Sequence, residues 1–361
     1  MINEKRRLKR YHPGVYVRDA LNDLNMSAKE FSIRSGISER TLSDLINEKG
    51  GITFDIAIKL AEFFKTSINV WTNLQNAYDA YIIEKRLKRE IEDDYELLKP
   101  FKKYLVENKV IDQNDDEFMV VAKTRSSFSI NRISLLNTNE LLVSFKEHSG
   151  KEHDNVFAEN LWIAYALTKA RKIETKPYDR QKLLKSLPNM TSLMGKNPKE
   201  FFPILVDILK ECGVAFVFVP YLSKSNIYGA SKWLSKDVVM LAISNRGGKA
   251  DVFWFTLFHE IAHVLMEHKR YCLLQFDGND DVEANIVGSN ILIRDEEWSS
   301  FINEHRIFDQ KSIEEFAKKV NVPSYIVLGR LAKEKHISYS NDLYQKSNPS
   351  CRNEDFIAEQ I

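Results

Sequence analysis

The sequence predicts a mainly α-helical protein with a small β-sheet, an α+β fold shared between two main domains. Short helical periods, several of them preceded by a capping residue, fill residues 12–80. Two runs of β-branched and apolar residues, 214–220 and 237–244, are typical of strands. An apolar helix that carries histidines follows them, "FWFTLFHEIAHVLMEHKR" at residues 253–270.

Length and composition place the chain among ordinary globular proteins. It has 361 residues, 43% hydrophobic and 29% charged, which suggests two or three domains with sizeable cores. The net charge is +1, so any affinity for nucleic acid must come from a local patch such as the basic run at residues 5–10. The charged amino terminus predicts no signal peptide, and no run approaches the ~18 apolar residues of a membrane span. We expect a cytoplasmic protein that does not bind membranes.

We divide the chain into five segments. Residues 1–80 are the segment of short capped helices, and 81–110 are predicted to form a charged helical connector with a break at Pro100. Residues 111–200 are expected to be mixed α/β, 201–345 to hold the histidine helix, and 346–361 to be a polar, frayed tail. The helix predicted at 200–213 ends at Gly213, and further helices are expected at 160–173, 281–293 and 312–320.

The amino-terminal segment has the pattern of a helix-turn-helix. Ser27 precedes one helix, which Gly36 ends; Ser38 caps a second helix and Thr53 a third. The second helix would lie in the major groove. With Leu42 and Leu45 facing the core, its outward side chains are the candidate DNA contacts Ser38, Glu39, Arg40, Thr41 and Ser43. The alternative is a small helical bundle that binds protein.

Residues 12–80 resemble the XRE-type DNA-binding domain of HigA-like antitoxins, from "HPG" at the entry to "WTNLQNAYD" at the exit. The resemblance implies a λ-repressor-like all-α fold that binds operator DNA as a homodimer on paired half-sites. The chain departs from the family at Ala28, where Gln is usual, and at Asn47-Glu48, where Asn-Gly is usual. These changes imply fewer backbone contacts to DNA and an added negative charge.

The histidine helix carries the spacing of a metal-dependent hydrolase. His259 and His263 are four residues apart, so they share one helix face and can bind one metal ion. Glu260 can take a proton from a water that the metal activates, and is the candidate catalytic residue. The alternative is a core helix whose histidines are hydrogen-bonded inside. Burying two imidazoles and a carboxylate costs several kcal/mol unless they are paired, which favours the metal site.

A third ligand would leave one open position on the metal, and Asp280, Asp281 and Glu283 follow downstream. Residues 155–335 resemble the ImmA/IrrE-type metallopeptidases, in "FHEIAHVLMEH" and "VEANIVGSNILI". This resemblance implies a zincin-like domain, with Glu283 as the third ligand and Zn²⁺ or Mn²⁺ as the metal. The strand that ends at Ser244 is expected to have an open edge, to which a substrate peptide could add.

Together these features predict a DNA-binding, antitoxin-like transcriptional regulator with a zinc-dependent endopeptidase domain. The peptidase would cleave a protein partner, or its own chain, and so alter repression. Two alternatives stay open. The protein could be a repressor or antitoxin whose metal site is structural or sensory, or a peptidase that the DNA-binding domain only localises.

Overall fold

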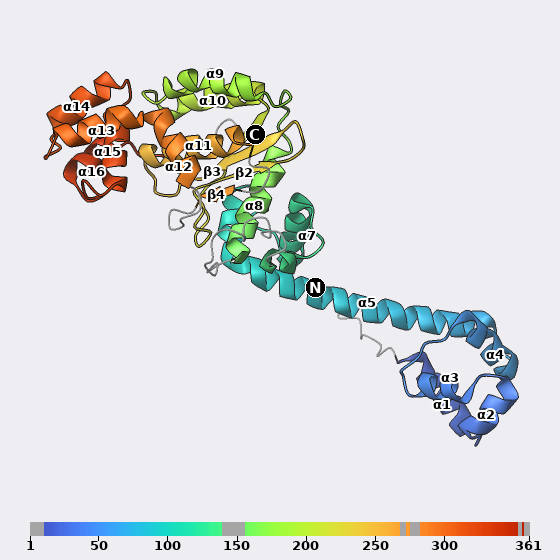
Figure 1. The fold of residues 1–361 in the computed structure, drawn as a ribbon. Helices are drawn as coiled ribbons and strands as arrows, with labels where there is room; N and C mark the ends of the chain where they lie inside the picture. The colour runs from blue at the N-terminus through green and yellow to red at the C-terminus, as the bar shows by residue number, and fades with distance from the viewer. Residues whose placement is uncertain (1–10, 139–155, 268–271, 275–281, 353–355, 357–361) are drawn as a thin grey trace. The chain divides into compact units, whose positions relative to one another are not determined.

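The computed structural model describes residues 11–138, 156–267, 272–274, 282–352 and 356. The chain forms two compact units, Met1–Glu96 and Leu97–Ile361. Both units are mainly helical and the second contains a four-stranded sheet, so the predicted α+β fold is confirmed (Figure 1). In the part of the chain that is described, no helix is both long and apolar enough to cross a bilayer.

The first unit is all-helical. Its elements are α1 (Pro13–Asp23), α2 (Ala28–Ser35), α3 (Glu39–Ile46), α4 (Phe54–Phe64) and most of α5 (Ile68–Leu98). The predicted caps are confirmed, since Ser27, Ser38 and Thr53 each accept a hydrogen bond from the backbone N–H three residues on. Gly36 ends α2 with a left-handed φ of 70°. These local signals fix where the helices begin and end.

Close contact between α1 and α3 holds the first unit together. A Cβ built on Gly14 would lie 1.7 Å from the carbonyl oxygen of Leu45, so no residue larger than glycine fits there. Leu42 and Leu45 are fully buried, as predicted for the core face of α3. The "HPG" entry is therefore a packing requirement of this unit.

The second unit begins with the end of α5. As predicted, Pro100 lies at a break, in the 3-10 helix η1 that follows α5. The further elements are η1 (Lys99–Phe101), α6 (Lys102–Glu107), α7 (Glu117–Phe128), η2 (Ile133–Asn137), α8 (Val156–Ala170), α9 (Arg180–Thr191), α10 (Pro198–Glu211), β1 (Val214–Phe218), β2 (Gly229–Trp233), β3 (Val239–Ile243), α11 (Ala250–Leu265), β4 (Cys272–Leu274), α12 (Val282–Leu292), α13 (Asp295–Glu304), α14 (Gln310–Lys319), α15 (Ser324–Lys333) and α16 (Asp342–Ser347). The described residues between 111 and 200 contain helices and no strand, so the mixed α/β prediction is wrong for them. The β-branched residues Val120 and Val121, for example, lie on the buried face of α7.

The sheet has the strand order β1-β3-β2-β4. β3 runs parallel to β1 and antiparallel to β2, and β2 also pairs with β4. Alternate residues of β1 and β3 belong to the core that α10 and α11 complete, and α8 packs against the same two strands and lies on the other side of the sheet from α9 and α10 (Figure 1). Strands covered on both faces read as continuous apolar runs, which is why β1 and β3 were predicted and β2 was not.

The pairing of β3 corrects one expectation. The strand ending near Ser244 was expected to have an open edge, but β3 is bonded on both sides, by β1 and by β2. A substrate peptide therefore cannot add to it. The sequence could not reveal this because β2 carries Gly, Ser and Lys, and becomes a strand only through its neighbours.

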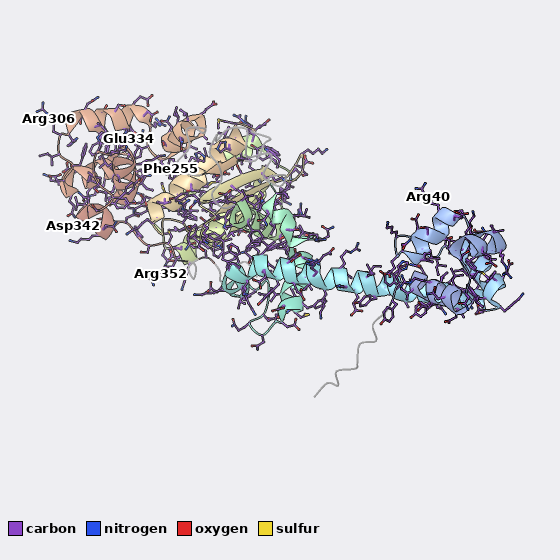
Figure 2. All side chains as sticks on the ribbon, turned by 90° about the horizontal axis from the view of Figure 1, so that it is seen from below. Arg40, Phe255, Arg306, Glu334, Asp342 and Arg352 are labelled. Carbon is purple, nitrogen blue, oxygen red and sulfur yellow. The ribbon has the colours of Figure 1, made fainter. Side chains whose placement is uncertain are left out.

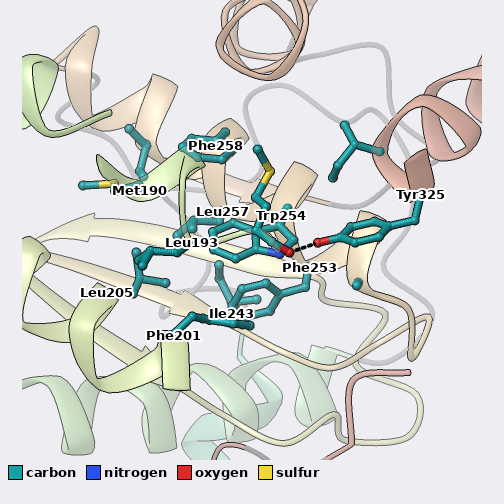
Figure 3. Close-up of a cluster of buried hydrophobic side chains, with 14 of the residues drawn as sticks. Met190, Leu193, Phe201, Leu205, Ile243, Phe253, Trp254, Leu257, Phe258 and Tyr325 are labelled. Carbon is teal, nitrogen blue, oxygen red and sulfur yellow. Dashed lines mark hydrogen bonds between the residues drawn. The ribbon is translucent and has the colours of Figure 1, made fainter. Parts of the chain in front are cut away.

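Helix α11 runs through the core of the second unit. Trp254 lies at the centre of an apolar cluster to which α9, α10 and β3 contribute, and Tyr325 of α15 closes it on one side (Figure 3). Only Val252 and Phe255 of the helix are even half-exposed. A helix buried this thoroughly must find partners for the polar backbone groups at its two ends.

The amino-terminal end of α11 is capped by the end of the chain. Lys249 gives no side-chain cap, and the backbone N–H of Ala250 donates to the carbonyl of Pro349 at 2.9 Å. The buried Asp251 accepts from the side chain of Asn348 at 2.6 Å and from the hydroxyl of Tyr344 at 3.0 Å. A segment about 100 positions away in sequence thus supplies the cap.

The other end of α11 is held by the segment that leads into α9. The hydroxyl of Tyr178 donates to the carbonyl of Val264 at 3.0 Å, and Arg180 Nε donates to that of Leu265 at 2.8 Å. Burial raises the pKa of Tyr178 to about 12, so the phenol keeps its proton and acts as a donor. The cationic guanidinium also suits a helix carboxy terminus.

The expectation of a frayed polar tail from Lys346 is wrong for its described residues. Cys351 is buried, and its backbone N–H donates to the carbonyl of Gly248. Phe356 is only 1% exposed and stacks on Phe218, with ring centroids 4.4 Å apart. The polar composition of this segment gave the wrong prediction because a few apolar residues are enough to anchor a segment in a core that has room for them.

We predict opposite outcomes for two substitutions of Asp251. Asp251→Ala leaves the Tyr344 hydroxyl and the Asn348 amide without their acceptor, and should lower the free energy of unfolding by about 1–3 kcal/mol. Asp251→Asn keeps an acceptor oxygen and should cost less. Urea unfolding of the full chain near neutral pH measures both, and equal losses would contradict the capping role.

The pH dependence gives a second check on Asp251. Burial raises the pKa of its carboxyl, so the folded chain binds this proton more tightly than the unfolded chain. The contribution of Asp251 to stability is therefore greatest at low pH and falls as pH rises through the raised pKa. Asp251→Asn should remove that part of the pH dependence.

Candidate metal centre and DNA interface

The two histidines of α11 meet as the spacing predicts. The Nε2 atoms of His259 and His263 are 3.1 Å apart, and both residues are almost completely buried. Their rings stand nearly perpendicular, at 78°, with centroids 4.7 Å apart. One turn of helix therefore brings two ring nitrogens to a single point.

This geometry fits a zinc ion. Two imidazole nitrogens that bind tetrahedral zinc at ~2.0–2.1 Å lie about 3.3 Å from each other. The observed separation of 3.1 Å is close to that value. Neutral imidazole nitrogen is also a donor that zinc prefers, so these two residues could hold the metal that the sequence predicts.

Helix α12 packs across α11 at the first histidine. Gly288 makes this possible, because a Cβ there would lie 3.0 Å from the backbone nitrogen of His259 and 3.1 Å from its Cα. Ala284, one turn earlier, is also buried. The side-chain oxygen of Asn285 lies 3.2 Å from Nδ1 of His259. The ring of His259 is thus contacted at one nitrogen by α12 and at the other by His263.

Glu260 is fully buried on the face of α11 that packs against β2. A Cβ built on Gly229 would lie 3.0 Å from Cγ of Glu260, 3.1 Å from its Oε1 and 2.7 Å from Cγ2 of Thr256. The absence of a side chain at Gly229 therefore gives the carboxylate its space. Tyr228, next to Gly229, is half-buried, and the guanidinium of Arg246 lies 4.4 Å from its ring centroid.

The structure does not bring the third predicted ligand, Glu283, together with the two histidines in a group of metal-binding side chains within the described ranges. Glu283 lies in the first turn of α12 and is exposed. No group of three His, Cys, Asp or Glu side chains is placed to share a metal ion within the described ranges. The role of Glu283 stays a prediction, and Asp280, Asp281 and His268 lie outside those ranges.

Sequence reasoning missed Gly229 and Asn285. Gly229 stands in "IYGASKW", which has no strand periodicity, and only the packing of β2 on α11 gives it a role. Asn285 is two residues after Glu283, in a stretch that was read for its acidic side chains. Its position in "VEAN" was the one available signal.

In the first unit, α2, the turn at Gly36 and α3 form the helix-turn-helix arrangement. Ser38, Glu39, Arg40 and Ser43 are exposed, and Thr41 is half-buried. Arg40 points away from the surrounding helices (Figure 2). The basic run at residues 5–10 lies outside the described residues.

Hydrogen bonds within α3 engage some of the candidate DNA contacts. The hydroxyls of Ser38 and Thr41 are 2.7 Å apart, and Ser38 also accepts from the backbone N–H of Thr41. Asn47 donates its side-chain amide to the carbonyl of Ser43. These bonds hold the first and last turns of α3, which leaves Arg40 as the long cationic side chain of its exposed face.

Glu48 occupies an unfavourable backbone conformation. Its φ is 62°, in the left-handed region where glycine is preferred. Arg18 lies beside it, with Nη2 4.0 Å from the Glu48 carboxylate and Nη1 donating to the carbonyl of Ile46. Both side chains are about half-exposed, so this ion pair contributes little to stability.

Two parts of the chain match known protein families. Residues 17–71 match the helix-turn-helix family, and residues 222–332 match the IrrE N-terminal-like domain of the M78 peptidases. The chain is 37% identical to the HTH-type transcriptional regulator YddM of Escherichia coli K12 over 73 residues, 20% of this chain and 78% of YddM. It is 31% identical over 74 residues to virulence-associated protein I of Dichelobacter nodosus, covering 20% of this chain and 68% of that protein.

Two solved structures are each similar to about a quarter of the chain. One is an addiction module antidote protein of a HigA family from Coxiella burnetii, at 33% identity, covering 24% of this chain and 96% of that one, with a TM-score of 0.23. The other is the Pseudomonas aeruginosa antitoxin HigA with the higBA promoter, at 31% identity, covering 24% and 95%, with a TM-score of 0.23. From the family matches and the curated relatives, the chain belongs to the XRE-type helix-turn-helix regulators and carries a second domain of the IrrE-like M78 peptidase family.

Proposed function

We propose that this chain is an antitoxin-like transcriptional regulator whose second unit is a zinc-dependent endopeptidase. Cleavage of a protein partner, or of the chain itself, would alter repression. The observation that carries the proposal is the convergence of two buried Nε2 atoms, 3.1 Å apart, on the same helix as the buried Glu260. That arrangement offers two imidazole nitrogens to a single cation.

The chain's own residues would divide the chemistry among them. His259, His263 and, as a prediction, Glu283 would hold Zn²⁺ or Mn²⁺. When bound, zinc supplies a Lewis acid that polarises water and a peptide carbonyl. Glu260 would take the proton of the attacking water and pass it to the leaving amine. Gly229 would keep that carboxylate in place, because the β2 backbone lies against it.

The first unit would bind operator DNA in the cytoplasm as a homodimer on paired half-sites. Support comes from the family match and from the exposed residues at the start of α3. We propose Ser38, Glu39, Arg40, Thr41 and Ser43 as its contacts, with Arg40 reaching a guanine or a phosphate.

A second function is a repressor or antitoxin in which the metal site is structural or sensory. One observation favours it, namely that the described residues contain no group of three ligand side chains around a single point. A cation held by fewer protein ligands could stabilise α11 without hydrolysing a peptide.

We predict that Glu260→Gln strongly slows cleavage and keeps the metal. Because Glu260 acts as a general base and is not a ligand, its loss should lower the rate about 10²–10⁴-fold. The measurement is mass spectrometry of the zinc-loaded full chain, incubated alone and with a proteome-derived peptide library, together with zinc content. Two outcomes would contradict the peptidase proposal and favour the repressor. One is cleavage by Glu260→Gln at the wild-type rate, and the other is no cleavage by the wild type.

Gly229→Ala provides an independent test of the same site. The added Cβ must displace Glu260 or Thr256, so cleavage should fall while zinc content stays near one per chain. Gly195→Ala is the matched control, since a Cβ there meets nothing within 4 Å.

Arg40→Ala should weaken operator binding about 10–100-fold, as expected for one base or phosphate contact of about 1–3 kcal/mol. The probe is a duplex that the wild-type chain selects from a random library, with affinity measured at several salt concentrations. Lys59→Ala removes the same charge from α4, where Lys59 pairs with Asp55, and should have little effect. Equal affinities for Arg40→Ala and wild type would exclude α3 as the recognition helix.

Replacing Glu48 should strengthen DNA binding. Glu48→Gly removes a negative charge near α3 and relieves the left-handed strain, which is worth about 1–2 kcal/mol. Glu48→Gln removes the charge only. We expect both variants to bind the selected duplex more tightly, and only Glu48→Gly to increase hydrogen-exchange protection of α1–α4. Unchanged affinity in both would mean that Glu48 lies away from the DNA.

A further inference from the structure

We infer that Asn285 is a positioning residue for His259. Its side-chain oxygen holds the imidazole in the tautomer that turns an unprotonated Nε2 toward His263. The inference rests on the proposed metal site and goes beyond it, because it gives α12 a role separate from that of Glu283.

The hydrogen bond determines the tautomer. Oδ1 of Asn285 lies 3.2 Å from Nδ1 of His259. An amide oxygen carries no proton, so Nδ1 must be the donor in this contact. A neutral imidazole has one N–H, and placing it on Nδ1 leaves the lone pair of Nε2 available.

The other tautomer would close the site. With its proton on Nε2, His259 could donate to Nε2 of His263 across the 3.1 Å that separate them. In this bond the proton lies between the two Nε2 atoms, so neither has a lone pair free to bind a cation. Asn285 acts against this tautomer by accepting the proton of Nδ1. A bond between the two rings would then require His263 to donate from its own Nε2.

Close helix packing keeps Asn285 in place. Gly288 lies against the backbone of His259, and Ala284, next to Asn285, is buried between the helices. A larger residue at position 288 would move α12 away from α11. The amide is therefore carried by a helix whose distance from His259 is set by two small residues.

The test is a Co²⁺ titration of the full chain, following the visible absorption of the bound ion. Asn285→Ala should weaken Co²⁺ binding about 10–100-fold, the usual cost of losing a partner of a metal-ligating histidine. Asn285→Asp keeps the acceptor and should bind at least as tightly as wild type. Ile286→Ala is the control, because Ile286 is the neighbouring exposed residue on α12 and should leave the affinity unchanged.

A second readout needs no metal. Long-range ¹H–¹⁵N spectra of the metal-free chain report which ring nitrogen of His259 is protonated. We expect the Nδ1–H form in the wild type and in Asn285→Asp, and a shift toward the Nε2–H form in Asn285→Ala. A purely structural role for Asn285 would change stability and leave the tautomer and the Co²⁺ affinity as they are.

The outcomes separate the inference from the function on which it rests. Equal Co²⁺ affinity and the same tautomer in Asn285→Ala and wild type would overturn the role of Asn285 and leave the metal site standing. A wild type that binds no Co²⁺, but whose tautomer depends on Asn285, would support the positioning role and refute the metal proposal.

Discussion

The candidate metal centre depends on the burial of one helix along nearly its whole length. Because α11 lies inside the core, the free N–H and C=O groups at its ends need partners within the protein. Residues 348 and 349 satisfy one end, and Tyr178 and Arg180 satisfy the other. The helix that carries the two imidazoles and the carboxylate is thus held by a segment about 85 positions before its carboxy-terminal end and by another about 100 positions after its amino-terminal end.

Three glycines let other elements approach α11 at its polar residues. Gly229 of β2 lies against Glu260, Gly288 of α12 against His259, and Gly329 of α15 against Asp251. At each position a Cβ would lie within about 3 Å of the helix. Small residues on the surrounding elements bring backbone close to these groups, and the polar side chains beside them, such as Asn285, come within hydrogen-bond range. The contacts that pack these elements against α11 are therefore the same contacts that set the geometry of the site.

The first unit is organised differently, since its function needs an exposed face. Its core is formed by residues at helical spacing, and the start of α3 is left outward. Glu48, just after the carboxy-terminal end of α3, keeps a strained backbone and a negative charge. In this unit the helix ends and the exposed residues at the start of α3 follow from local features. In the second unit the site exists only through contacts between distant segments.

The sequence by itself determined the helices α2, α3 and α4 of the first unit, the strands β1 and β3, and the pairing of His259 with His263. Caps, apolar periods and an i, i+4 spacing act within a few residues, so they can be read locally. Only the tertiary structure decided that β3 is internal, that the last residues cap α11, and that Asn285 contacts His259. Those facts depend on which distant segments pack together. Gly229, Asn285 and Phe356 carry no periodic signal, because their roles come from the neighbours that folding brings to them.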